Sequence, residues 1–270
     1  MLVGGGHANV QVLRKLCMNE YKGLNVILIS EGYESIYSGM TPGYIKNIYS
    51  LEDISIDLQR LCFNAGATFI KDKVINLDSK NQIIHLNQNP SISYDALSIN
   101  SGSISNNQNI KFDKKSNVIS VKPISTLISK LKVIDDLIEK SSNRKISIIG
   151  GGVAAFELSF ALYKRYSENI SLDIISDQFL IEKNLNQSSI NTLKKIAKNL
   201  NINLISKKVI DIHDSEISLE DGSKSQSELV LLSTGAALPD WLAESNLEIN
   251  ENFIAVNHHL QSLNHKNIFV

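Results

Sequence analysis

Two glycine-rich turns stand at the same distance from an acidic residue, and this repeat constrains the fold more than any other feature. The first turn begins at Gly4, 27 positions before Glu31. The second begins at Gly150, 27 positions before Asp177. An apolar segment precedes each turn and a helix-like segment follows it, as in the strand–G-x-G-x-x-G–helix motif. A repeat of this size indicates two copies of one structural unit.

The positions within each turn have separate physical roles. The first glycine forms the tight turn, the second lets the backbone approach a pyrophosphate, and the third allows a helix to pack closely on a strand. The first copy has Gly4 and Gly6, but Asn9 replaces the third glycine. We expect Asn9 to be tolerated if the helix stands slightly off the sheet. The second copy keeps both glycines and has Ala155 in the third position.

The repeat continues beyond the turns. Each copy goes on to a helical stretch, a strand, a strand pair and a closing apolar strand that ends in Ser-Gly or Thr-Gly. The interval from Val74 to Gly102 is 28 residues, and that from Val209 to Gly235 is 26. The sequence therefore predicts an α/β fold with two Rossmann-like units, each with a parallel sheet and a β-meander.

Composition excludes several classes of function. The net charge is −1 and the sequence pI is about 6.6, so no basic face for nucleic acid is expected. No apolar run reaches the roughly 18–20 residues of a membrane span, and no secretory signal is recognisable. We expect a cytoplasmic protein, with peripheral membrane contact left open, and no metal site. Cys17 and Cys62 form no C-x-x-C motif and are interpreted as buried thiols in a reducing compartment.

The order of parts resembles the two-dinucleotide-binding-domain flavoproteins, the pyridine nucleotide-disulfide reductase superfamily. YSGMTPGYI at 37–45 is similar to the loop that type II NADH dehydrogenases place against the flavin. Together with GGGHANVQVLR, VKPI at 121–124 and LSTGAALPDWL at 232–242, it most resembles the dehydrogenase-like flavoproteins found fused ahead of selenide, water dikinase, and their unfused relatives. The superfamily's redox cysteine pair is missing after Glu31, which argues for hydride relay through flavin without dithiol chemistry.

The resemblance implies two sets of cofactor-binding residues. The set for FAD is Gly4, Gly6, His7, Glu31, Gly39, Met40, Thr41, Val74, Ser101 and Gly102. The set for the nicotinamide cofactor is Gly150, Gly152, Val153, Glu157, Asp177 and Gly235. We expect NADH in preference to NADPH, because the carboxylate of Asp177 accepts from a free ribose hydroxyl and repels a 2′-phosphate.

Three of the assigned residues have alternative interpretations. Lys122 either places a positive charge near the flavin or is a solvated hinge lysine. Glu157 either lies near the nicotinamide, as in the superfamily, or complements the dipole at a helix N-terminus. His7 either lies near the flavin or pyrophosphate or faces solvent from its turn. No side chain is required as an acid or base, since the flavin carries the hydride.

The resemblance also implies domain boundaries. We expect an FAD-binding domain in residues 1–115 and 245–270, with an NAD(P)H-binding domain inserted at 116–244. In the superfamily, a strand such as NHKNIFV at 264–270 runs into a Gly-Asp that binds the flavin ribityl chain. The sequence given stops at Val270, so we expect a fragment with an incomplete flavin site.

Two functions are compatible with these sequence features. The first is an FAD-dependent NAD(P)H oxidoreductase that relays hydride from NADH through flavin to a small-molecule acceptor. The acceptor is a quinone or, in a fusion with selenide, water dikinase, a selenium compound; that link rests on analogy alone. The second is a non-catalytic nucleotide-binding or redox-sensing module that regulates a partner domain. The oligomeric state stays open.

Overall fold

The chain folds into two compact units, each made of several segments. The computed structural model describes residues 1–270 except positions 20, 108–109, 114–115, 140–142, 180–182 and 184. Unit 1 comprises Met1–Tyr37, Ser55–Ile104 and Ala237–Val270. Unit 2 comprises Ser38–Ile54 and Ser105–Ala236.

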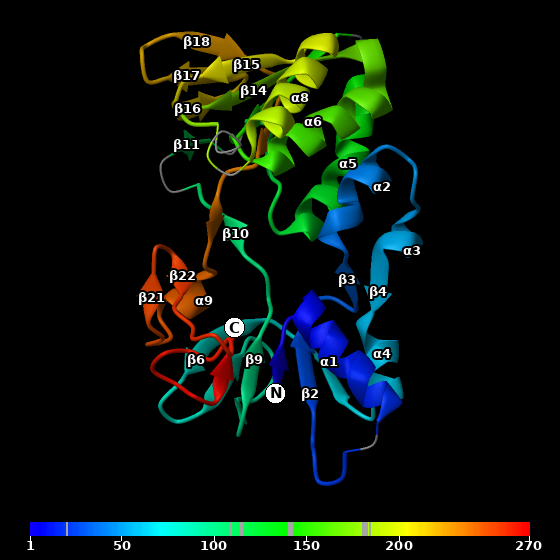
Figure 1. Cartoon of the computed structure of the whole chain (residues 1–270), viewed down its shortest axis with the longest axis vertical. Helices are drawn as coiled ribbons and strands as arrows, with labels where there is room; N and C mark the ends of the chain where they lie inside the picture. The colour runs from blue at the N-terminus through cyan, green and yellow to red at the C-terminus, as the bar shows by residue number, and fades with distance from the viewer. Residues whose placement is uncertain (20, 108–109, 114–115, 140–142, 180–182, 184) are drawn as a thin grey trace. The chain divides into compact units, whose positions relative to one another are not determined.

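Unit 1 is built on a five-stranded parallel sheet (Figure 1). In spatial order its strands are β23 (Ile268–Phe269), β9 (Leu97–Ile99), β1 (Leu2–Val3), β2 (Ile27–Ser30) and β5 (Thr68–Lys71). A three-stranded antiparallel meander follows, made of β6 (Val74–Asp78), β7 (Ile83–Leu86) and β8 (Ile92–Ser93). The short strand β1 is central, and it leads directly into the first glycine turn.

Helices and two small hairpins complete unit 1. The helices are α1 (His7–Met18), α4 (Leu58–Asn64) and α9 (Asp240–Ala243). The hairpins pair β3 (Glu34–Ile36) with β4 (Ser55–Asp57), and β21 (Ile249–Asn250) with β22 (Phe253–Ile254). Asp57 is the N-cap of helix α4. Its carboxylate accepts a hydrogen bond of 2.8 Å from the backbone N–H of Arg60 and so stabilises the start of the helix.

Unit 2 repeats this plan with longer strands. Its parallel sheet runs β12 (Val118–Ser120), β19 (Leu229–Leu232), β13 (Arg144–Ile149), β14 (Ile170–Ser176) and β15 (Asn203–Ser206). Its second sheet runs β11 (Lys111–Phe112), β16 (Val209–His213), β17 (Glu216–Leu219) and β18 (Lys224–Gln226). Around the glycine-turn strand, β19-β13-β14-β15 matches β9-β1-β2-β5 of unit 1, so the predicted fold class is confirmed.

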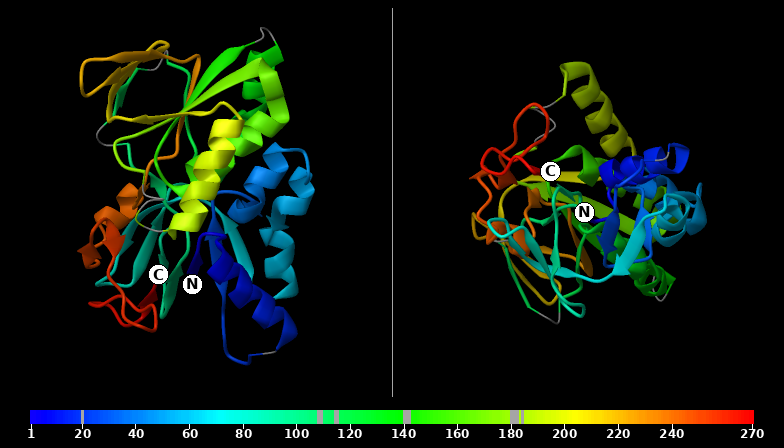
Figure 2. Two further views of the ribbon diagram at one scale, coloured as in Figure 1. Left: turned by 45° about the horizontal axis from the view of Figure 1, so that its top comes forward. Right: turned by 90° about the horizontal axis from the view of Figure 1, so that it is seen from below.

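Unit 2 has seven helices among its described residues. They are η1 (Ser38–Met40), α2 (Thr41–Ile45), α3 (Leu51–Ile54), α5 (Ile124–Glu139), α6 (Val153–Tyr166), η2 (Ser167–Asn169) and α8 (Gln187–Asn199). Helices α5 and α6 contact strands of the parallel sheet, and α2 packs on α6. Two further short strands, β10 (Ile104–Ser105) and β20 (Ala236–Ala237), pair where the chain passes between the units. Figure 2 shows α8, in yellow, and the two larger sheets of unit 2 from a second side.

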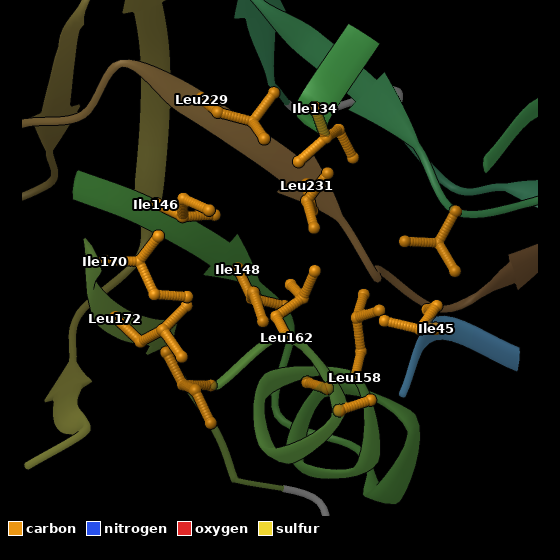
Figure 3. Packing of buried hydrophobic residues seen from close by; sticks show 14 of the residues in the cluster. Ile45, Ile134, Ile146, Ile148, Leu158, Leu162, Ile170, Leu172, Leu229 and Leu231 are labelled. Atoms are coloured by element: carbon orange, nitrogen blue, oxygen red, sulfur yellow. The ribbon is translucent and has the colours of Figure 1, made fainter. Parts of the chain in front are cut away.

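The core of unit 2 explains why α6 is apolar on several sides. Leu158 and Leu162 of α6 are almost fully buried against Ile148 of β13 (Figure 3). Ile45 of α2 reaches the same cluster and is only 1% exposed. Parallel strands covered by helices are buried on both faces, which accounts for the near-continuous apolar runs of β13, β14 and β19.

The units differ from the expected domain boundaries at three places. Residues 38–54 lie in unit 2, not with the first domain, because Ile45 is part of the unit 2 core. Residues 105–113 also lie in unit 2, because β11 pairs with β16; the expected boundary at 115 lies outside the described residues. Residues 237–244 lie in unit 1, where Leu242 is buried in the core with Leu77.

One guanidinium holds the 38–54 segment in unit 2. Arg165 of α6 binds the carboxylate of Asp135 in α5 through two hydrogen bonds, of 2.8 and 2.7 Å. Its Nη1 also donates to the backbone carbonyl of Ile45 at 3.0 Å and to the side chain of Asn47 at 2.5 Å. The hydroxyl of Tyr166 donates to Asp135 at 2.7 Å. A single side chain therefore joins α2, α5 and α6.

We expect Arg165→Met to lower the free energy of unfolding by about 2 kcal/mol, since it removes charge-assisted hydrogen bonds from a half-buried carboxylate. Burial raises the pKa of Asp135. Hydrogen bonds from Arg165 and Tyr166 lower the same pKa by a larger amount, so the net pKa is below its ordinary value. Such a group stabilises the fold above its unfolded pKa, and the stabilisation is lost as pH falls through the folded pKa.

The wild type should therefore lose more thermal stability than Arg165→Met between about pH 5 and pH 3. Thermal unfolding followed by circular dichroism over this range measures the difference. The exposed neighbour Lys164→Met is the matched control. Equal effects of the two substitutions would show that this hydrogen-bond network does not carry the stabilisation.

Candidate functional site

The second glycine turn brings three parallel strands to one point. Gly150 has φ of +143°, and a Cβ there would lie 2.2 Å from the carbonyl oxygen of Ser233. Its N–H donates to Ile175 at the end of β14, at 2.9 Å. Only glycine fits between these strand ends, so the turn is fixed at the carboxyl edge of the sheet, where open α/β sheets bind ligands.

Helix α6 begins at this edge with an open N-terminus. Gly152 is its N-cap and supplies no side-chain hydrogen bond. No atom lies within 4 Å of a Cβ built on Gly152. The next residues, Val153 and Ala154, are exposed. First-turn N–H groups and the helix dipole favour an anion at such a position.

A cleft of about 750 Å³ lies over this turn, entirely within unit 2. This volume falls within the range of small-molecule and cofactor sites. All six residues expected to bind the nicotinamide cofactor line the cleft: Gly150, Gly152, Val153, Glu157, Asp177 and Gly235. The structure therefore brings this set together, although their roles stay predictions.

An acidic and a basic residue that follow strands β14 and β15 line the cleft. Asp177 follows β14 and is exposed, with its carboxylate accepting from the N–H of Gln178 at 2.8 Å. Lys208 follows the neighbouring strand β15 and lines the same cleft. Lys183 donates to the side chain of Gln178 at 2.9 Å. Asp177 therefore precedes the residue that Lys183 contacts, and Lys208 lines the same cleft.

Two residues expected near the flavin also line this cleft. Lys122 is half-buried, and its backbone N–H donates to the hydroxyl of Ser105 at 3.3 Å. Gly39 lies on the wall with Ser38, in the segment that belongs to unit 2. Met40 and Thr41 follow in the same segment. Thr41 is 4% exposed, and its hydroxyl has no hydrogen-bond partner among the described residues.

The first glycine turn also meets the end of a neighbouring strand, but a side chain, that of Asn100, lies beside it. Gly4 has φ of +87°, and a Cβ there would lie 2.3 Å from the Cα of Ser101. A Cβ on Gly6 would lie 2.2 Å from the side-chain oxygen of Asn100. The same oxygen accepts from the N–H of Ala8 at 2.9 Å. Asn100 therefore accepts from one backbone N–H in the first turn of α1. At the second glycine turn, no side chain caps the first turn of α6 in this way.

Asn9, at the position of the third glycine, is accommodated by hydrogen bonds to the turn and to β9. Its side chain is fully buried and donates to the carbonyls of Val3 at 3.1 Å and Gly4 at 2.9 Å. The hydroxyl of Ser98 on β9 donates back to Asn9 at 2.7 Å. A third glycine would allow the helix to pack closely on the strand. Here, the Asn9 amide instead joins α1 to the turn and to β9 through hydrogen bonds.

The remaining residues expected to bind FAD in unit 1 lie along the strand ends. His7 is exposed, and its ring packs edge-on against Tyr37 at a centroid distance of 4.5 Å. Glu31 directly follows β2 and is exposed. Ser101 and Gly102 follow β9 and are exposed, and Gly102 has φ of +79°. Val74 begins β6 and is buried.

Sequence reasoning missed Asn100 and Lys208. Asn100 lies one residue before the expected Ser101, but nothing in the sequence shows that it faces the glycine turn. Lys208 had a usable signal, because it precedes Val209 as Lys73 precedes Val74 in the other copy.

Two general features complete the description. Among the described residues, one group with metal-ligand chemistry occurs, made of Asp113, His213 and Asp214, with ligand atoms within 4.8 Å of one another. It is absent from the cleft lining, and His213 and Asp214 are exposed. Within the described part of the chain, no helix is long and apolar enough to span a bilayer.

Comparisons with known proteins agree with this architecture. The family model described as pyridine nucleotide-disulphide oxidoreductase matches residues 1–270. No curated protein sequence matches the chain.

Solved structures share the fold at low sequence identity. Reduced CoADR-RHD of Bacillus anthracis gives a TM-score of 0.83 at 18% identity, covering 99% of this chain and 49% of that one. The sulfide:quinone oxidoreductase of Aquifex aeolicus gives 0.78 at 19% identity, covering 99% and 66%. The water-forming NADH oxidase of Lactobacillus brevis, bound to NADH, gives 0.80 at 18%, covering 99% and 60%. This chain thus spans about half to two thirds of their lengths.

We expect Gly152→Val to fold but to weaken dinucleotide binding about tenfold or more, equivalent to at least ~1.4 kcal/mol. The space around Gly152 accepts a side chain, but the new methyl groups would occupy the approach to the start of α6. Titration calorimetry with NADH measures the affinity, and circular dichroism checks the fold. Thr192→Val, on the exposed face of α8, is the control. Unchanged NADH affinity in Gly152→Val would contradict the assignment.

Proposed function

Because the chain belongs to the pyridine nucleotide-disulphide oxidoreductase family, we propose that it forms the nucleotide-binding part of an FAD-dependent NADH oxidoreductase. In this proposal, unit 1 binds FAD and the unit 2 cleft binds NADH. The observation that carries the proposal is the cleft itself, which joins an open helix N-terminus to an exposed acid at the neighbouring strand end.

The residues of the cleft fit a dinucleotide. The open N-terminus of α6 binds the pyrophosphate, since Gly152 leaves room for it and the first-turn N–H groups point to it. The carboxylate of Asp177 accepts hydrogen bonds from the ribose hydroxyls. Glu157 also lines this cleft, which supports its proposed place near the nicotinamide; Lys122 lines it too, and its proposed role is to place a positive charge near the flavin.

We propose that unit 1 binds a second dinucleotide, at a turn with fewer open backbone donors than the turn of unit 2. Gly4 permits the tight turn and Gly102 leaves open space beside it. Glu31 is exposed at the end of β2, and its proposed role is to bind the ribose. Asn100 already occupies one donor of α1, so the phosphate contacts depend on the other turn groups. Bound FAD would supply the two-electron chemistry, accepting hydride from NADH and passing electrons onward.

The acceptor is proposed to be a small molecule. Two of the similar structures are named as a sulfide:quinone oxidoreductase and a water-forming NADH oxidase, and a third is a putidaredoxin reductase in complex with putidaredoxin, so the fold serves small-molecule and protein acceptors alike. A selenium compound, and fusion to selenide, water dikinase, rest on the sequence resemblance alone. A location in the cytoplasm is likewise part of the proposal.

An anaerobic visible spectrum tests the proposal. We expect the protein, purified or reconstituted with FAD, to show a flavin band that bleaches when NADH is added. A bound flavin that NADH does not bleach would favour the regulatory nucleotide-binding module instead. If no flavin binds, the assignment of the first glycine turn is wrong.

Coenzyme preference gives a separate test. We expect wild-type protein to bind NADH more tightly than NADPH, and Asp177→Ala to reduce this preference about tenfold, or ~1.4 kcal/mol. The substitution removes the acceptor for the ribose hydroxyl and the charge that repels a 2′-phosphate, while Lys183 and Lys208 remain nearby. Calorimetric titration with both coenzymes measures the ratio, with Lys224→Ala as control. A wild-type preference for NADPH would overturn the role of Asp177.

A further inference from the structure

Two cysteines that are far apart in sequence lie on neighbouring helices. Cys17 stands in the last turn of α1, and Cys62 stands in α4. These helices pack side by side in unit 1 through Leu13 and Leu58, which are both fully buried (Figures 1 and 2). The Sγ of Cys17 lies 3.8 Å from the carbonyl oxygen of Leu61, the residue that precedes Cys62.

The two thiols have opposite exposure, which corrects the expectation that both are buried. Cys17 is exposed, because it lies at the end of α1, and it lines a cavity of about 400 Å³ between the ends of α1 and α4. Cys62 is 0% exposed and belongs to the apolar cluster. An oxidant in solution therefore reaches Cys17 directly, whereas the buried Cys62 is shielded from it.

The chemistry of the buried thiol agrees with this order. Burial, together with the adjacent Cys17, raises the pKa of Cys62 to about 11. Cys62 thus remains a protonated thiol near neutral pH, and thiols in that form react slowly with oxidants.

We propose that Cys17 and Cys62 form a reversible disulfide that joins α1 to α4. A hydroperoxide first oxidises the Cys17 thiol to a sulfenic acid, and the hydroperoxide is reduced to an alcohol or, for hydrogen peroxide, to water. The Cys62 sulfur then attacks the Cys17 sulfur, forming the S–S bond and releasing the sulfenic oxygen as water with the thiol proton. A dithiol reductant restores both thiols by exchange.

The bridge would act on the first glycine turn through the same helix pair. At the opposite end of α1, a Cβ on Gly5 would lie 2.5 Å from the side chain of Leu58 at the start of α4. The turn is therefore in contact with α4, and a covalent bond between the helices limits their relative motion. The thiol chemistry does not depend on the proposed oxidoreductase function.

Peptide mapping of the full chain tests the proposal. The protein is treated with hydrogen peroxide at low molar excess, blocked with iodoacetamide, digested without reductant and analysed by mass spectrometry. We expect a peptide pair linked through Cys17 and Cys62 that is lost after reduction with dithiothreitol. In Cys62→Ala, dimedone should label Cys17 as a trapped sulfenic acid. In Cys17→Ser, Cys62 should remain unmodified.

Each contrary result would overturn the proposal. These results are a linked dimer through Cys17, Cys17 oxidised to sulfinic acid with Cys62 still reduced, or unmodified thiols in the wild type. Because Cys17 is exposed, Cys17→Ser should preserve the circular dichroism spectrum. That variant therefore keeps the test valid even if Cys62→Ala fails to fold.

Discussion

Both units depend on a glycine turn that touches the end of a neighbouring strand. At Gly4 and Gly150, a Cβ would lie 2.3 and 2.2 Å from backbone atoms of residues 101 and 233. The missing side chain lets the central strand, its two neighbours and the following helix meet at one edge. The carboxyl ends of the strands, the helix N-terminus and the acid after the second strand are then held together, and both proposed sites are built on this edge.

The two units differ in how the helix after the glycine turn packs on the sheet. In unit 2, Ala155 is small and fully buried, so α6 packs directly on the sheet and its N-terminus stays open. In unit 1, Asn9 links α1 to the turn by hydrogen bonds, and Asn100 occupies the space beside Gly6. A buried amide is stable only when it is fully hydrogen-bonded, which Ser98 and the turn carbonyls achieve here.

The sequence was sufficient to predict the two parallel sheets and six residues of the cleft lining, because strand periodicity, glycine spacing and the terminal acid are local patterns. It was insufficient for Ser38–Ile54, whose place depends on Arg165, more than 100 residues away, and on burial of Ile45. The hydrogen bonds of Asn9 could not be predicted for the same reason, since its partner Ser98 is 89 positions distant. Cys17 and Cys62 resemble isolated thiols until α1 and α4 pack together. These contacts join distant segments and leave no periodic signal.

Because the two turns differ, an anion binds under different conditions at the start of α6 and at the start of α1. An anion at α6 meets an open N-terminus, so much of its binding free energy is available without rearrangement. At α1, the N–H of Ala8 is already bonded to Asn100, so a phosphate there must either displace that amide or bind through the remaining groups. Binding at unit 1 therefore depends more heavily on contacts away from the helix, such as Glu31 and the open face at Gly102. A helix pair whose motion is limited by a disulfide would alter this less preorganised turn, and would leave the cleft of unit 2 unchanged.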